Sequence, residues 1–335
     1  MGFLQLHLLV QFQFHDTTPL FSTVKLSPAY TVLSEKDRTV YCLRRNEYLP
    51  EGAGPLFPEN QSLAVLQEAR DRQTVLEGMA IRCGSSRDLA VRFGGYEGTI
   101  PRADAIHPSI SGSDRDIAIL SRVGKPTCFT ITDIAVDGGG KPHLTLSRRR
   151  AQEQAIAWLL ENGNPGQVLP AKVTHLEKFG AFVDLGCGVT SLAPLENISV
   201  SRIPHPSARF RTGQEILTLV VGVDREASRF YLSHKELLGT WMENAAQFAP
   251  GDAVTGIVRG IRDYGIFIEL TPNLSGLADW RPGLEPGDQV SVYIKSIRPD
   301  TRKIKLQVIQ NLGPSETLPA LKYFITDGTV ENWRY

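Results

Sequence analysis

Two short stretches of the chain place a pair of aromatic residues around a glycine. The stretch KFGAFVDLG holds Phe179 and Phe182, and DYGIFIELT repeats the spacing with Tyr264 and Phe267. Residues three apart on a flat strand point to opposite faces, but an intervening glycine permits a bend or bulge that brings both rings to one surface. Aromatic rings side by side on a barrel wall suit stacking against unpaired bases. The spacing therefore predicts two exposed aromatic platforms, with a place in the core for one or both rings as the alternative.

The other chemistry-bearing residues form no recognisable catalytic or metal site. The four cysteines include no CxxC pair and are widely separated, at Cys42, Cys83, Cys128 and Cys187. That spacing argues against zinc and against a disulfide framework, so we expect reduced thiols. The glycine run that begins at Asp137 lacks the spacing of a phosphate-binding loop and is typical of a hairpin turn. We therefore predict no enzymatic activity, no metal and no cofactor.

The composition is that of a globular protein with several domains. The chain has 335 residues, of which 41% are hydrophobic, and its 36 Lys and Arg equal its 36 Asp and Glu. This length predicts two to four domains. Zero net charge argues against a strongly basic nucleic-acid binder, but not against a protein that holds single strands by stacking beside a local basic groove. The opening stretch MGFLQLHLLVQFQFH lacks a basic start and a cleavage site, and no segment has the apolar length of a membrane span, so we expect a cytoplasmic protein.

An internal repeat positions the two aromatic stretches. One copy, PGQVLPAKVTHLEKFGAFVDLGCGVTSLAPL, begins at Pro165, and the next, PGDAVTGIVRGIRDYGIFIELTPNLSGLADW, begins at Pro250. Each copy contains four or five short strands separated by turn signals, which is typical of a small closed β-barrel. A third copy upstream has Arg87, Asp88 and Leu89 in place of the aromatic–glycine element. Helices are predicted between the barrels, over about 59–73, 147–162 and 233–247.

The repeats resemble the S1 RNA-binding domain, a module that recurs in the large mRNA-binding protein of the bacterial small ribosomal subunit. The resemblance is carried jointly by FGAFVDLG, ISVSRIPHPSARFRTGQE and LSHKELLGTW, and it is closest over 165–235, weaker over 250–308 and faint over about 76–149. It implies all-β modules with linking helices, namely three tandem five-stranded OB-fold barrels. The implied division is a partly ordered N-terminal extension at 1–57, a degenerate barrel with a leading helix at 58–150, a barrel with a linker helix at 151–235, a shortened barrel with a linker helix at 236–310, and an aromatic tail at 311–335. We expect that tail to pack on the third barrel.

The resemblance also implies which residues contact RNA. The family binds RNA on the face that carries the strand-entry aromatic, the next phenylalanine, a histidine and a late arginine. Carried over by position and joined by nearby basic residues, the predicted RNA-binding set is Lys178, Phe179, Phe182, Arg202, His205, Arg229, Arg262, Tyr264, Phe267 and Lys303. Pro194 and Asp279 stand where the family has its histidine. The connection after Trp280 is short, so we expect a shallower and weaker site in the third barrel.

These observations predict a protein that binds single-stranded RNA or mRNA and acts in translation. The first repeat lacks the aromatic pair, and the resemblance implies that such degenerate leading repeats dock on protein. Residues 58–150 are therefore expected to do so, with the small ribosomal subunit as the candidate partner. Two alternatives stay open. Near-zero net charge and the missing histidines favour a protein-interaction scaffold that has lost RNA binding. The use of the same module beside nucleases favours an accessory of RNA processing.

Overall fold

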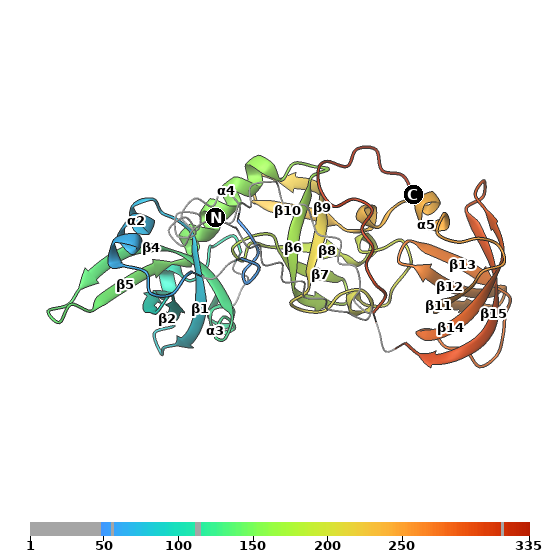
Figure 1. Cartoon of the computed structure of the whole chain (residues 1–335), viewed down its shortest axis with the longest axis horizontal. Helices are drawn as coiled ribbons and strands as arrows, with labels where there is room; N and C mark the ends of the chain where they lie inside the picture. The colour runs from blue at the N-terminus through green and yellow to red at the C-terminus, as the bar shows by residue number, and fades with distance from the viewer. Residues whose placement is uncertain (1–47, 55–56, 111–114, 316–317) are drawn as a thin grey trace, which may run out of the picture. The chain divides into compact units, whose positions relative to one another are not determined.

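Three β-barrels make up most of the described chain. The computed structural model describes residues 48–54, 57–110, 115–315 and 318–335. Within these ranges the strands close into three five-stranded barrels that follow one another along the sequence (Figure 1). In each barrel the first strand pairs with the second and the fourth, and the third runs parallel to the fifth. This is the OB-fold topology, so the predicted fold class is confirmed. The extension predicted for 1–57 lies mostly outside the described residues.

The first barrel carries its helical segments before its first strand and between its third and fourth strands. Its strands are β1 (Leu76–Cys83), β2 (Leu89–Phe93), β3 (Tyr96–Ile100), β4 (Pro126–Val136) and β5 (Pro142–Ser147). Its helical segments are α2 (Leu63–Asp71), the 3-10 turn η1 (Arg102–Asp104) and α3 (Arg115–Leu120). The predicted hairpin at Asp137 joins β4 to β5, where Asp137 Oδ1 accepts from the backbone N–H groups of Gly139 and Lys141.

The second and third barrels repeat this plan with different connections. The second contains β6 (Val168–Glu177), β7 (Gly180–Asp184), β8 (Thr190–Pro194), β9 (Glu215–Asp224) and β10 (Arg229–Ser233). A long connection between β8 and β9 holds the 3-10 turns η2 (Leu195–Asn197) and η3 (Pro206–Ala208). The third contains β11 (Ala253–Arg262), β12 (Gly265–Thr271), β13 (Leu274–Ala278), β14 (Asp288–Arg298) and β15 (Lys303–Pro314).

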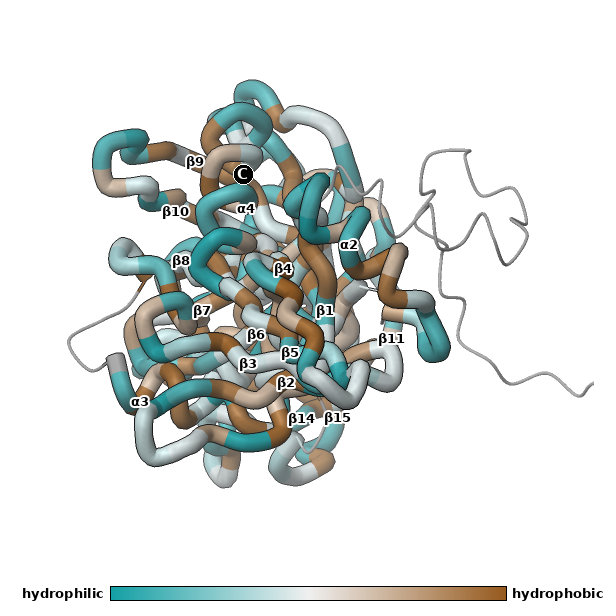
Figure 2. The backbone as a smooth tube through the Cα atoms, turned by 90° about the vertical axis from the view of Figure 1, so that its left-hand side faces the viewer, coloured by the Kyte–Doolittle hydropathy of each residue, from teal (hydrophilic) through white to brown (hydrophobic). Residues whose placement is uncertain are grey.

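Each barrel encloses its own hydrophobic core. The alternation of side chains along a strand sends every second residue inward. In β10, for example, Phe230 and Leu232 are buried while Arg229 and Tyr231 are exposed. Figure 2 shows the same division along the chain, with hydrophobic segments mainly on strands and hydrophilic ones mainly on the connecting turns. The outward positions are therefore available for binding.

The helix before the second barrel matches its sequence signals. Helix α4 (Arg148–Asn162) starts after Ser147, whose side chain accepts a hydrogen bond from the backbone of Arg150, and it ends at Gly163. A serine N-cap satisfies one of the free N–H groups at a helix start. The predicted helix over 147–162 is thus present with the expected ends.

The helix predicted over 233–247 is instead broken in two. The 3-10 turn η4 (Lys235–Leu238) ends at Gly239, and α5 (Trp241–Ala245) follows. Gly239 has a φ of +81°, which glycine adopts readily, and the ring of Phe324 lies 2.7 Å from where its Cβ would be. A capping box forms between Thr240 and Glu243 at the start of α5. The tail of the chain therefore packs at this break.

A buried ionic cluster joins the segment before the first barrel to α4. Glu51 accepts from Arg148 Nε at 2.8 Å and forms an ion pair with Arg122 at 2.7 Å. Its backbone N–H donates to the carboxylate of Asp184 in the second barrel at 2.8 Å. Burial raises the pKa of Glu51, but the guanidinium groups of Arg122 and Arg148 together outweigh burial. The pKa of Glu51 therefore lies below its ordinary value. Buried charges persist when they are paired in this way.

The C-terminal tail packs on both the second and the third barrel. Tyr323, Ile325 and Val330 join a small apolar cluster with residues of the second barrel. An isolated bridge also pairs Thr329 with Gln167, next to β6. At the very end, the hydroxyl of Tyr335 donates to the carbonyl of Asn273 in the third barrel at 2.7 Å. The expectation that the tail packs on the third barrel is therefore incomplete, because apolar tail residues also pack on the second.

Candidate nucleic-acid interface

The first aromatic residue of each pair lies in a hairpin turn. Strand β6 ends at Glu177, which pairs with Gly180 at the start of β7, so Lys178 and Phe179 form a two-residue turn. In the third barrel Arg262 pairs with Gly265, and Asp263 and Tyr264 occupy the matching turn. Side chains alternate between the two faces only within a strand. The ring of a turn residue can therefore lie on the same side as the phenylalanine three residues later.

The glycine of the motif has a different role from the one expected. A Cβ on Gly180 would overlap the carbonyl oxygen of Ala193, and one on Gly265 would lie 2.5 Å from the carbonyl oxygen of Ala278. Glycine is needed because the neighbouring strand passes too close for any side chain. The β-bulge is on the opposite strand, between Val173 and His175 in β6. The predicted bulge is therefore not at the glycine but on the opposite strand, and both rings still reach one surface.

The two aromatic pairs have the same geometry. The ring centroids of Phe179 and Phe182 are 6.0 Å apart with planes at 89°, and those of Tyr264 and Phe267 are 6.1 Å apart, also at 89°. Phe179 is 56% exposed and Tyr264 69% exposed, which excludes the core alternative for these two. The rings meet edge to face and are not parallel plates. Two bases stacked on one pair would therefore lie at right angles to each other.

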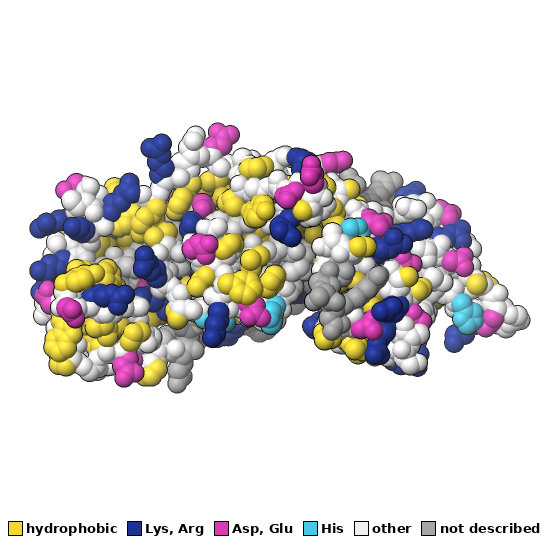
Figure 3. All heavy atoms as spheres, turned by 180° about the vertical axis from the view of Figure 1, so that it is seen from behind, with side chains coloured by type: hydrophobic (Ala, Val, Ile, Leu, Met, Phe, Trp, Pro, Cys, Tyr) yellow, Lys and Arg dark blue, Asp and Glu magenta, His cyan; other side chains and the backbone are white. Residues whose placement is uncertain are grey.

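The predicted basic residues on the strands lie on the outer surface. Arg229 is the first residue of β10 and Lys303 the first residue of β15, and both are exposed. Lys178 is exposed in the turn beside Phe179, and Arg262 is exposed at the end of β11. Figure 3 shows Lys and Arg side chains beside hydrophobic ones on the surface of the third barrel, at the left of that view. A positive charge is thus available near stacking surfaces without a net charge on the chain.

Arg202 and His205 lie in the connection between β8 and β9 and not on the strands of the aromatic pair. His205 uses its ring nitrogen Nδ1 to accept from the backbone N–H of Ser207 at 3.1 Å, which caps η3. The same connection contacts the third barrel, where Ser201 N–H donates to the carbonyl of Pro272 at 3.0 Å. The third barrel has only a short connection at this place, from which we expected a shallower site there. The structure gives the long connection of the second barrel a role in joining two barrels.

One part of this junction was missed by sequence reasoning. Arg209 is fully buried and forms an ion pair with Glu269, which also binds Arg259 at 2.8 Å. Glu269 occupies the position that Asp184 has in the second barrel, two residues after the phenylalanine. Both acidic residues are buried and hold a neighbouring part of the chain. The recurrence of an acid at this position was the available signal for a structural contact.

The first barrel has a different surface at the equivalent place. Arg87 forms an ion pair with Asp116 at 3.4 Å, and Arg102 binds the same carboxylate at 2.9 Å. The carboxylate of Asp88 accepts from the backbone N–H of Arg102 at 2.8 Å. The charged side chains that replace the aromatic pair therefore bind other residues of the first barrel, and this barrel offers no ring at either position.

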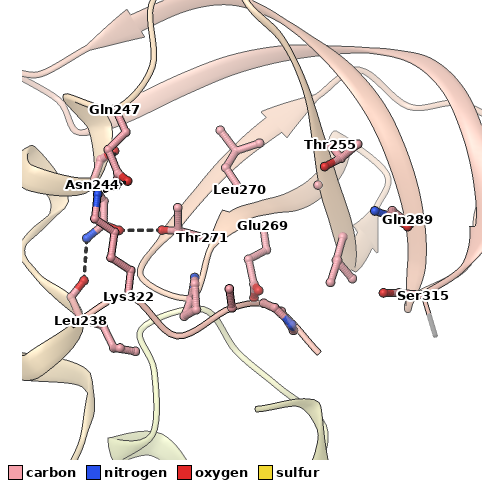
Figure 4. A pocket seen from close by; sticks show the side chains of 15 residues that line it. Leu238, Asn244, Gln247, Thr255, Glu269, Leu270, Thr271, Gln289, Ser315 and Lys322 are labelled. Carbon is pink, nitrogen blue, oxygen red and sulfur yellow. Dashed lines mark hydrogen bonds between the residues drawn. The ribbon is translucent and has the colours of Figure 1, made fainter. Parts of the chain in front are cut away.

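A separate cavity of about 310 Å³ lies between the third barrel, α5 and the tail (Figure 4). Asn244 donates to the carbonyl of Leu238 at 2.8 Å and accepts from the hydroxyl of Thr271 at 2.7 Å. Lys322 Nζ donates to Gln247 at 2.9 Å. These polar groups bind one another and so support the junction of tail and barrel.

Comparisons with known proteins agree with the module that the sequence resembles. Residues 163–235, which contain the second barrel, match the family described as S1 RNA binding domain. The small ribosomal subunit protein bS1 of Staphylococcus aureus is 32% identical over 186 residues, covering 52% of this chain and 47% of that protein. The bS1 protein of Staphylococcus haemolyticus is 36% identical over 187 residues, covering 51% of this chain and 47% of that protein. This chain spans about half the length of the curated relatives it matches.

One solved structure was also matched. It is a multidomain protein with nucleic acid binding domains from Streptococcus pneumoniae, 15% identical, with 71% of this chain and 74% of that chain covered and a TM-score of 0.25. The predicted resemblance to S1-domain proteins is confirmed by the family match and the bS1 relatives. The individual RNA contacts stay predictions.

Proposed function

We propose that this S1-like chain binds single-stranded RNA through the surfaces of its second and third barrels that carry the aromatic pairs. The observation that carries the proposal is the recurrence of one geometry, an exposed turn aromatic beside a strand phenylalanine at 6.0 and 6.1 Å. Exposing an apolar aromatic ring to water is unfavourable and adds little to the stability of the fold. The repetition of such a ring at the same place in two barrels therefore supports a binding role. The match of residues 163–235 to an RNA-binding domain supports the same ligand.

Stacking supplies the main binding energy in this proposal. Each base that stacks on an aromatic side chain contributes on the order of 1–3 kcal/mol, with little dependence on the base. Lys178 and Arg229 in the second barrel and Lys303 in the third contact phosphates. Because only a few cations lie near each pair, the affinity should depend modestly on salt.

We further propose a role in translation, with mRNA as the RNA and the cytoplasm as the location. The support is the similarity to bS1 proteins, which are small ribosomal subunit proteins by name. Residues 58–150 would then dock on the small subunit, since the first barrel has ion pairs in place of rings at the stacking positions. Binding, and not catalysis, is the proposed activity. Among the helices of the described ranges, none combines the length and the apolar character that a membrane span needs.

The proposal is tested by titrating the full chain against a pyrimidine-rich single-stranded RNA. Replacing Phe179 and Phe182 together by Ala should weaken binding about 10-fold or more, because at least one stacked base is lost. Replacing Tyr293 by Ala is the matched control, since this tyrosine is 41% exposed on β14 of the third barrel. Thermal unfolding of each variant shows whether the barrels remain intact. A folded double variant that binds like the unchanged chain contradicts the proposal and favours the scaffold alternative.

A further inference from the structure

The register of the second barrel extends the aromatic surface across its wall. Phe182 of β7 lies opposite Leu192 of β8, and Leu192 lies opposite Tyr231 of β10. On the other side, Phe182 lies opposite His175 of β6. Residues directly opposite on paired strands point to the same face of the sheet. These four residues, His175, Phe182, Leu192 and Tyr231, form one row across four strands, called here the transverse row.

Tyr231 is an outward and accessible member of the transverse row. Its side chain is 48% exposed, whereas its neighbours Phe230 and Leu232 are in the core. On its far side it pairs with Gly222 of β9, and a Cβ there would lie 3.5 Å from the tyrosine ring. The ring therefore lies over a position without a side chain, which leaves its outer face open. Arg229, two residues earlier on the same strand face, is also exposed.

The other end of the row continues the ring surface. The imidazole of His175 stacks on Phe182 with ring centroids 6.5 Å apart and planes at 28°. Its Nε2 lies 2.7 Å from a carboxylate oxygen of Glu177. This contact fixes the orientation of the imidazole beside the phenylalanine. The row therefore presents aromatic rings from three of its four members.

The third barrel has the same row with different residues. Phe267 lies opposite Leu277, and Leu277 lies opposite Lys305 of β15. Lys305 thus stands where the second barrel has Tyr231. On the other side, Phe267 lies opposite Gly260, which stands where the second barrel has His175. The two barrels share the pair of aromatic residues at the hairpin but differ on both sides of it.

We propose that Tyr231 is a third base-stacking residue of the second barrel, which would then hold a segment of about three nucleotides, while Lys305 gives the third barrel a phosphate contact instead. This inference rests on the proposed RNA binding and deepens it. Neighbouring strands are about 4.8 Å apart, so the two strand steps from Phe182 to Tyr231 separate their backbones by about 10 Å. That distance leaves room for separate bases on the two rings.

The difference between tyrosine and lysine has a measurable consequence. A stacked base contributes affinity that salt hardly changes, whereas a phosphate contact adds about 0.7 to the slope of log affinity against log salt concentration for single strands. Exchanging the residue in the second barrel for the one found in the third should therefore change the salt dependence as well as the affinity.

The test uses the full chain and oligouridine RNAs of increasing length. Tyr231→Ala should weaken binding of the longer RNAs about 5-fold or more, and Tyr231→Phe, which keeps the ring, should bind within about 2-fold of the unchanged chain. Tyr231→Lys should lose the stacked base yet steepen the salt slope by about 0.7. Tyr293→Ala is again the matched control and should leave binding unchanged. Tyr231 is half exposed, so these variants should keep the thermal unfolding transition.

The outcomes separate this inference from the proposed function. If Phe179 and Phe182 matter but Tyr231→Ala binds normally, the third stacking position is refuted and RNA binding stands. Equal losses in Tyr231→Ala and Tyr293→Ala would also refute it, because the effect would not belong to the row. If the unchanged chain fails to bind any of the RNAs, both the inference and the proposed function fall.

Discussion

A buried histidine makes the stability of the second barrel depend on pH. His234 is fully buried, its Nδ1 lies 2.8 Å from the carbonyl oxygen of Ile198, and its Nε2 lies 3.1 Å from the hydroxyl of Tyr323. A carbonyl only accepts, so Nδ1 carries the proton and Nε2 accepts from Tyr323. Burial raises the pKa of Tyr323 to about 12, which keeps that hydroxyl protonated. The neutral imidazole therefore fits its surroundings.

Burial lowers the pKa of His234 to about 4 from its ordinary 6.5, and the positive charge of Arg209 adds to the shift. Below pH 6.5 the unfolded chain binds a proton that the folded chain does not, so stability falls as the pH falls from 6.5 to 4. Each pKa unit corresponds to 1.36 kcal/mol, so the free energy of unfolding falls by about 3 kcal/mol as the pH falls through this window. Above pH 6.5 none of this stability is lost.

The assay is chemical denaturation of the unchanged chain and of His234→Asn at several pH values between 4 and 8. Asn retains a donor near the carbonyl of Ile198 but does not titrate. The variant should be the less stable form at pH 8, and the difference between the two should shrink by about 3 kcal/mol by pH 4. All other groups titrate in both proteins and cancel in the difference. A difference that stays constant across this range would refute the account of the buried neutral histidine.

Two further variants test the packing that positions the site. Gly180→Ala should destabilise the second barrel by about 1–3 kcal/mol in denaturation, because its Cβ would overlap the carbonyl of Ala193. Gly260→Ala is the control and should be tolerated, because the space around Gly260 is open. Equal effects of the two substitutions would contradict the argument that a close strand requires glycine at position 180. Glu269→Gln should lower the free energy of unfolding by about 3–5 kcal/mol, since Arg209 and Arg259 would lose their buried counter-charge. An unchanged denaturation midpoint would show that the ion pair of Arg209 and Glu269 does not hold the second barrel's connection to the third.

Local patterns predicted the barrels and the aromatic pairs. The alternation along each strand and the repeated spacing of Phe179 and Phe182 are short-range features, and they depend on geometry that a few residues define. The capping of α4 by Ser147 is another such feature. The role of the glycine was misread because Gly180 is required by a strand that lies 13 residues further along the chain, at Ala193.

Contacts between distant segments could not be read from those patterns. The pairing of Arg209 with Glu269 joins residues 60 positions apart. The recurring acid marks Glu269, but no local pattern marks Arg209 as its buried partner. Phe324 likewise packs against Gly239 from a distant part of the chain, at the break in a helix that local periodicity favours. The transverse row was also missed, because Tyr231 meets Leu192 only through the barrel register.

The most direct test of the central claim is to map where RNA contacts the full chain. Oligouridine carrying a photoreactive base is cross-linked to the protein, and the modified peptides are identified by mass spectrometry. We expect cross-links on the aromatic faces of the second and third barrels, at Phe179, Phe182, Tyr231 and Tyr264, and few on the first barrel. Cross-links concentrated on residues 58–150, or spread evenly over the three barrels, would contradict the claim that the aromatic pairs bind RNA.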